Sequence, residues 1–89
     1  MNALDHDLLT AARTGDTDRV RTAIEGGARV DVRDEELRTP LLLAVHGDHV
    51  EAARLLVAAG ADPNAQDLRE DSPWLATGVT GSVAMLHVL

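Results

Sequence analysis

The chain repeats its own pattern every 33 residues, and this period limits its fold more than any other feature of the sequence. The three parts of the chain align at this spacing without an insertion. Residue pairs at this spacing include Leu8 and Leu41, Ala11 and Ala44, Arg21 and Arg54, Gly27 and Gly60, Asp34 and Asp67, Leu42 and Leu75, and Val50 and Val83. Such a period is typical of repeat proteins, in which each unit packs on its neighbours.

The composition fits thin units that stack closely. The 89 residues include a single Trp and no Phe or Tyr, although aromatic side chains bury the most area in an ordinary core. A core of Ala, Leu and Val instead lets neighbouring elements approach one another. At this length the chain is expected to form one small domain.

The charge balance narrows the classes of partner. Eight arginines stand against fifteen acidic residues, for a formal net charge of −7. This balance argues against a nucleic-acid partner, because phosphate binding draws on clustered Lys and Arg. The absence of Cys excludes disulfides and thiolate metal sites. No apolar run reaches the ~18 residues of a membrane span and no signal peptide is recognisable, so the sequence predicts a soluble cytoplasmic protein without membrane contact.

The first half of each unit predicts a short helix. In the second unit Thr39 is a good N-cap, and Pro40 suits the first helical position because its missing N–H costs nothing there. Residues 41–45 are apolar nearly all round, as expected for a helix that is covered on both faces. In the first unit, the corresponding helix is expected to begin near Asp5 or Asp7.

The second half of each unit predicts another helix. Asp48 followed by Glu51 resembles a capping box, which would open a helix that runs through Ala59. Gly27 and Gly60 stand where the end of such a helix needs a residue in the left-handed conformation. Each unit is therefore expected to be a helix, a turn, a second helix and a longer turn.

These motifs resemble the ankyrin repeat family. Residues 39–45 match its T-P-L-x-x-A start, residues 51–56 its E-x-x-x-L-L helix, and residues 60–65 its G-A-D-x-N-A turn. The resemblance implies an all-α ankyrin-repeat solenoid of helix-turn-helix units with extended turns. It also implies a single domain over residues 1–89, with a cap-like first repeat at 1–33, a second at 34–66 and a truncated third at 67–89.

One departure from the family pattern lies in the extended turns. Leu37 and Glu70 stand where the family usually has Gly in the extended turn. We therefore expect these turns either to adopt another conformation or to carry backbone strain.

The sequence gives no reason to expect an enzyme, a cofactor or a bound metal ion. His46, Asp48, His49 and Glu51 are metal-ligand types close together, but a helix break separates the two imidazoles, and solvated polar residues are the better interpretation. Paired carboxylates such as Glu35 and Glu36 lie on exposed turns, where nothing would shift their pKa values.

The resemblance implies that the function is binding to another protein, one with a neutral or basic surface. In the family, partners dock on the concave face formed by turn tips and first helices. Carried over by position, the candidates here are Arg13, Thr14, Arg33, Glu35, Glu36, Arg38, His46, Gln66, Leu68, Arg69, Asp71, Val79 and Thr80. Leu37 and Leu68 are candidate apolar anchors, although the Leu37 side chain has a second interpretation, in which it folds inward.

Two alternatives stay open for the function. The chain could be a capping segment of a longer ankyrin array whose partner-binding surface lies in further repeats. It could also form a homo-oligomer through the uncovered face of its last helices, because apolar side chains there would point toward a further repeat. The candidates for self-association are Trp74, Val83, Leu86 and Leu89.

Overall fold

The computed structural model describes residues 2–89, except for the side chains of Val79 and Thr80. This part of the chain contains six helices and no strand. In chain order they are α1 (Ala3–Thr14), α2 (Thr17–Glu25), α3 (Pro40–His46), α4 (Val50–Ala58), α5 (Pro73–Thr80) and α6 (Val83–Val88). The predicted all-α class is confirmed.

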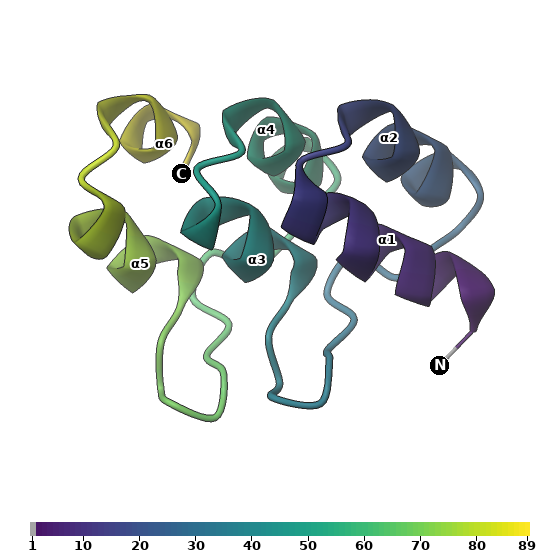
Figure 1. Ribbon diagram of the computed structural model, residues 1–89, viewed down its shortest axis with the longest axis horizontal. Coiled ribbons are helices and arrows are strands. Elements are labelled where there is room, and N and C mark those ends of the chain that lie inside the picture. Colours follow the sequence, from purple (N-terminus) through teal and green to yellow (C-terminus); the bar gives the residue numbers. More distant parts are fainter. Residues whose placement is uncertain (1) are drawn as a thin grey trace.

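The helices form three pairs that lie side by side in one row (Figure 1). One layer of the row holds α1, α3 and α5, and the other holds α2, α4 and α6. The central helix α3 packs against both α1 and α5, so every residue from Pro40 to Val45 is buried. Small side chains such as Ala11, Ala44 and Ala53 are fully buried, which lets the layers approach closely without aromatic residues.

The first helix of the second pair begins as predicted, and that of the third pair begins in the same way. The Thr39 hydroxyl accepts a hydrogen bond from the Leu42 N–H at 3.2 Å, and the Ser72 hydroxyl accepts one from the Leu75 N–H at 3.2 Å. Pro follows each cap residue, where the helix has no use for its N–H.

The start predicted for α1 is wrong by a few residues. The helix begins at Ala3, because the Asn2 side chain accepts the Asp5 N–H at 2.8 Å and so serves as its cap. Asp5 is instead buried inside the first turn. Its carboxylate accepts hydrogen bonds from the Arg29 N–H at 2.8 Å and from the Arg29 guanidinium at 3.0 Å. These bonds lower the pKa of Asp5, with the backbone N–H of Arg29 as the largest cause.

The capping box predicted for α4 is also wrong. Asp48 lies in the left-handed conformation with φ 56°, and α4 begins only at Val50 after the cap residue His49. The 33-residue spacing explains this, since Asp48 matches Gly15 and Gly81, whose φ angles are 78° and 67°. Asp tolerates this conformation better than most residues because its short polar side chain can bond locally.

The His49 imidazole joins the first two helical pairs. Its Nε2 lies 3.1 Å from the Arg13 carbonyl oxygen, at the end of α1. A Cβ added to Gly15 would clash with Nδ1 of the same ring, and one added to Gly47 would clash with its Nε2. The ring therefore occupies space that any side chain at these two glycines would need.

The loops between the pairs contain the turns that the sequence singles out. Gly27 and Gly60 have φ angles of 98° and 97°, as predicted for the residues that follow α2 and α4. Leu37 and Glu70 have φ angles of 61° and 62°, in the region that side chains other than Gly rarely adopt. Of the two expectations for these turns, backbone strain is the one confirmed.

Candidate functional site

Two long loops project from one side of the helical row and lie next to α1, α3 and α5 (Figure 1). We call the exposed surface of residues 31–38 and 62–71, together with the adjoining sides of these three helices, the loop face. It contains most of the residues that the sequence nominates for partner binding. Its geometry is therefore the first test of whether those residues lie together.

Each loop folds around one aspartate. The Asp34 carboxylate accepts the N–H groups of Glu36 and Arg38, both at 2.9 Å. Its repeat equivalent Asp67 accepts the N–H groups of Arg69 at 2.8 Å and Asp71 at 3.0 Å. Two hydrogen bonds accepted by one carboxylate fix the turn locally, so each loop tip has a defined shape.

Hydrogen bonds also fasten the two loops to each other. The Leu68 N–H donates to the Glu36 carbonyl oxygen at 3.0 Å, and the Asp62 N–H donates to the Asp31 carboxylate at 3.1 Å. The Arg33 guanidinium donates to the Leu37 carbonyl oxygen at 3.1 Å and also to the Gln66 carbonyl oxygen. The tips are thus held in a fixed register, one repeat apart.

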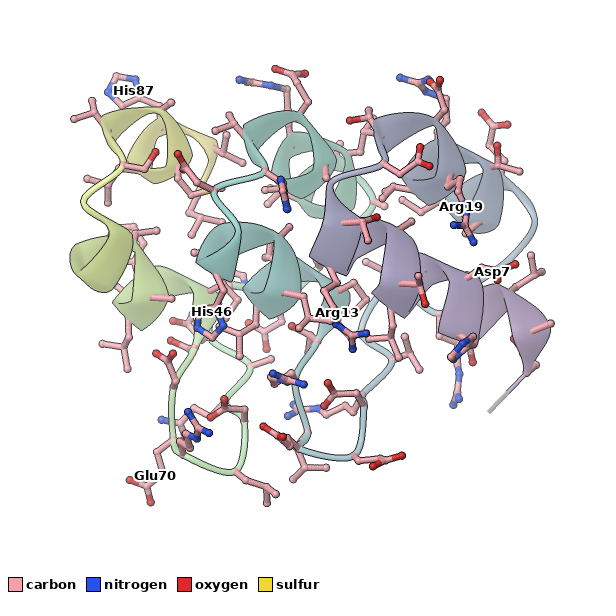
Figure 2. All side chains as sticks on the ribbon, in the orientation of Figure 1. Asp7, Arg13, Arg19, His46, Glu70 and His87 are labelled. Atoms are coloured by element: carbon pink, nitrogen blue, oxygen red, sulfur yellow. The ribbon has the colours of Figure 1, made fainter. Side chains whose placement is uncertain are left out.

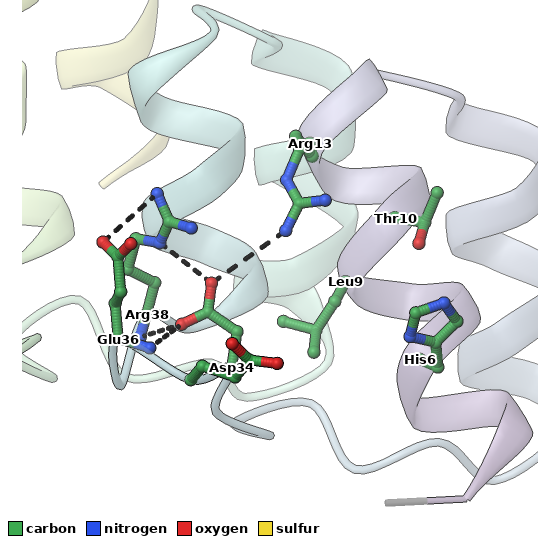
Figure 3. A pocket seen from close by; sticks show the side chains of 8 residues that line it. His6, Leu9, Thr10, Arg13, Asp34, Glu36 and Arg38 are labelled. Atoms are coloured by element: carbon green, nitrogen blue, oxygen red, sulfur yellow. Dashed lines mark hydrogen bonds and ion pairs between the residues drawn. The ribbon is translucent and has the colours of Figure 1, made fainter.

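A shallow cavity of about 330 Å³ lies between α1 and the first loop (Figure 3). In its wall, Asp34 accepts the Arg38 guanidinium at 2.8 Å and lies 4.0 Å from the Arg13 guanidinium. Another nitrogen of the Arg38 guanidinium lies 3.8 Å from the Glu36 carboxylate. The wall of the cavity therefore carries paired acidic and basic groups.

The pKa of Asp34 reflects these contacts. Partial burial is the largest single effect and acts to raise the pKa of this carboxyl. The hydrogen bonds from the N–H and guanidinium of Arg38 and from the Glu36 N–H act in the other direction and together outweigh it. The pKa of Asp34 therefore lies below its ordinary value, and the group is ionised at neutral pH.

Sequence reasoning missed four residues of this cavity, three of them on α1 and one on the first loop. His6, Leu9 and Thr10 line it from α1, alongside the nominated Arg13. A signal for them exists in the sequence, because positions 6, 9, 10 and 13 follow the spacing of one helical face. The missed aspartate Asp34 stands on the 33-residue repeat with Asp67.

The second loop carries a similar but smaller cluster. Nε2 of His46, at the end of α3, lies 2.9 Å from the Asp71 carboxylate, which joins α3 to this loop. The Gln66 side-chain amide donates to the Glu70 carbonyl oxygen at 3.3 Å. His46 and Arg13 both point toward the loops from the helices above them (Figure 2).

The two candidate anchors are both at the surface. Leu68 is 64% exposed and Leu37 is 43% exposed, so the Leu37 side chain does not fold into the core. The cross-loop bond between Leu68 and Glu36 keeps these two tips close to each other.

The remaining nominated residues have other placements. The Thr14 hydroxyl donates back to the Thr10 carbonyl oxygen at 3.1 Å, within α1. Glu35 and Arg69 are exposed on the loop tips. The side chains of Val79 and Thr80 lie outside the described residues, so the structure leaves these two candidates as predictions.

The described residues contain no group of three or more His, Asp or Glu side chains arranged to hold a metal ion. Within the same residues, no helix has the length and apolar character needed to cross a membrane. The loop face presents paired charges, backbone groups and two exposed leucines.

Comparisons with known proteins indicate the family to which the chain is similar. Residues 5–67 match a family model described as ankyrin repeats in three copies. The chain is 41% identical to ankyrin repeat domain-containing protein 63 of Homo sapiens, over 79% of this chain and 18% of that protein. It is 37% identical to ankyrin repeat and KH domain-containing protein mask-1 of Caenorhabditis elegans, over 96% of this chain and 3% of that protein. It is also 35% identical to the human 2-5A-dependent ribonuclease, over 91% of this chain and 11% of that protein. The chain spans less than a fifth of each of these relatives.

Proposed function

Because this chain belongs to the ankyrin repeat family, we propose that it binds another protein through its loop face. Ankyrin repeats are generally modules for protein–protein interaction and are typically not catalytic. The observation that carries the proposal is the fastening of the two loops by hydrogen bonds one repeat apart. A surface that is already ordered loses less conformational entropy when a partner binds.

The charges of the loop face favour a neutral or basic partner. Residues 31–38 carry four acidic residues against two arginines, and residues 62–71 carry four against one. The two loop tips thus have formal net charges of −2 and −3. Complementary charge on a partner would speed association and make it sensitive to salt.

The exposed leucines supply an apolar element to this acidic surface. Leu68 and Leu37 lie near exposed Glu35, Glu36 and Glu70 on the same tips. An aliphatic side chain of the partner, with basic residues beside it, fits this arrangement. Apolar anchors at the centre of an interface carry much of its binding energy.

A charge-reversal experiment tests the proposal. Peptides selected from a displayed library on this chain are measured against the chain and against Leu68→Ala and Glu35→Arg on the loop face. The matched control is Glu51→Arg, which makes the same charge change on the exposed side of α4. We expect each loop-face variant to bind at least about tenfold more weakly and the control to be unchanged.

The competing interpretation makes a different prediction in the same experiment. If the chain only caps a longer array, the loop face has no special role, and the peptides should bind the loop-face variants and Glu51→Arg alike. Selection of acidic peptides would contradict the assignment of a neutral or basic partner.

A further inference from the structure

One end of the helical row exposes large apolar side chains. On α5 and α6, Trp74 is 51% exposed, Leu75 55%, Val83 67% and Leu86 42%. The residues one repeat earlier than three of these are Leu41, Leu42 and Ala53, and all three are fully buried. The four exposed side chains, which we call the α5–α6 face, therefore have the chemistry of the contacts between neighbouring helical pairs.

The helices α5 and α6 also lack acidic and arginine side chains. All fifteen acidic residues and all eight arginines lie within residues 1–71, and none lies from Ser72 to Leu89. Two copies of a chain with net charge −7 repel each other over most of their surfaces. The four side chains of the α5–α6 face add no charge to this repulsion.

From these two observations we propose that the α5–α6 face binds the same face of a second copy and forms a homodimer. Burial of large apolar side chains against each other provides the driving force. Because the same surface is used on both copies, the contact closes after two subunits.

The opposite end of the row explains why the contact is face to face. There, Arg19 of α2 lies 3.7 Å from Asp7 of α1, and Asp18 and Thr22 lie beside them around a shallow cavity. Figure 2 shows Asp7 and Arg19 at this end, far from α5 and α6. Head-to-tail stacking would cover these charged and polar groups with apolar side chains, which is unfavourable.

One residue predicted for self-association has a different role. Leu89 is half-buried and packs on the core of the molecule. It is therefore left out of the α5–α6 face, which contains Leu75 in addition to the predicted Trp74, Val83 and Leu86.

The dimer is tested by mass and by fluorescence on the 89-residue chain. Sedimentation from about 1 µM to about 1 mM should show the mass rising from 9.5 kDa to twice that value. Because Trp74 is the only Trp, its emission should shift to the blue over the same concentration range as it leaves water. A mass of 9.5 kDa at every concentration, or growth beyond the dimer, would overturn the proposal.

Charged substitutions locate the interface. Val83→Glu and Leu86→Glu should each hold the mass at 9.5 kDa and remove the concentration-dependent shift of emission. Val83 is in the first turn of α6, where an acidic residue suits the helix and the fold is kept, as circular dichroism should show. Leu68→Glu is the matched control, since it charges an exposed leucine on the loop face and should leave the dimer intact. A dimer that survives both α6 variants, or one that Leu68→Glu dissolves, would overturn the assignment of this face.

Discussion

Replacing Glu70 with Gly should stabilise the protein, because this residue holds the left-handed conformation at φ 62°. That conformation costs about 1–2 kcal/mol for a residue with a Cβ, and Gly is free of the cost. Gly also makes the unfolded chain more flexible, which offsets about 0.4–1 kcal/mol of the gain. The Glu70 side chain is exposed, and the hydrogen bond that it receives from Gln66 is to its backbone oxygen, so neither packing nor that bond is lost.

The expected net gain is about 0.5–1 kcal/mol in the free energy of unfolding. For a domain of this size, that gain corresponds to an increase in Tm of about 2–8 °C. Urea and thermal unfolding followed by circular dichroism measure both quantities. Glu70→Ala is the matched control, since it removes the same carboxylate but keeps a Cβ, and its stability should stay within about 0.5 kcal/mol of the starting protein. Equal gains in both variants would show that charge removal and not backbone strain is responsible, and a loss in Glu70→Gly would refute the reasoning outright.

Three further predictions follow from the buried contacts. The folded-state pKa values of Asp5 and Asp34 are lowered, so their contribution to stability is complete above the unfolded pKa of about 3.9 and is lost as the pH falls through the folded values. Thermal unfolding from pH 7 down to about pH 2.5 should show this loss, and Asp34→Asn should reduce it; an unchanged Tm across that range would contradict the assignment. Thr39→Ala should lower the free energy of unfolding by about 0.5–2 kcal/mol in urea titrations, whereas Thr39→Ser should keep the cap of α3 and most of the stability. Leu42→Ala should cost about 2–5 kcal/mol, whereas Leu75→Ala, at the same position of the next repeat, should cost much less in dilute solution because half of that side chain is exposed; similar losses would mean that Leu75 is packed.

Much of the fold could be predicted from local patterns. The 33-residue spacing predicts the stacked helical pairs, and the caps at Thr39 and Ser72 predict where α3 and α5 begin. The errors occur where one residue type has two uses. Asp48 is a residue type common at helix caps, but it takes the left-handed conformation of Gly15 and Gly81. Asp5 stands where a cap was expected, but its carboxylate pairs with Arg29.

The candidate site was less predictable because its contacts cross repeats. Most nominated residues do lie on the loop face, but the bond from Arg33 to the Gln66 carbonyl oxygen joins residues one full period apart. No local pattern reports such a contact. The helical spacing from His6 to Arg13 is the signal that would have found the α1 side of the cavity.

The placement of His49 between Gly15 and Gly47 has a consequence for protein engineering. Shuffling helical pairs between homologous arrays treats each pair as an interchangeable part. Here the His49 imidazole of the second pair fits only because Gly15 of the first pair has no Cβ. A recombinant that brings a bulkier residue to position 15 therefore has a steric clash. A usable library of chimaeras must therefore keep Gly15 and His49 from the same parent.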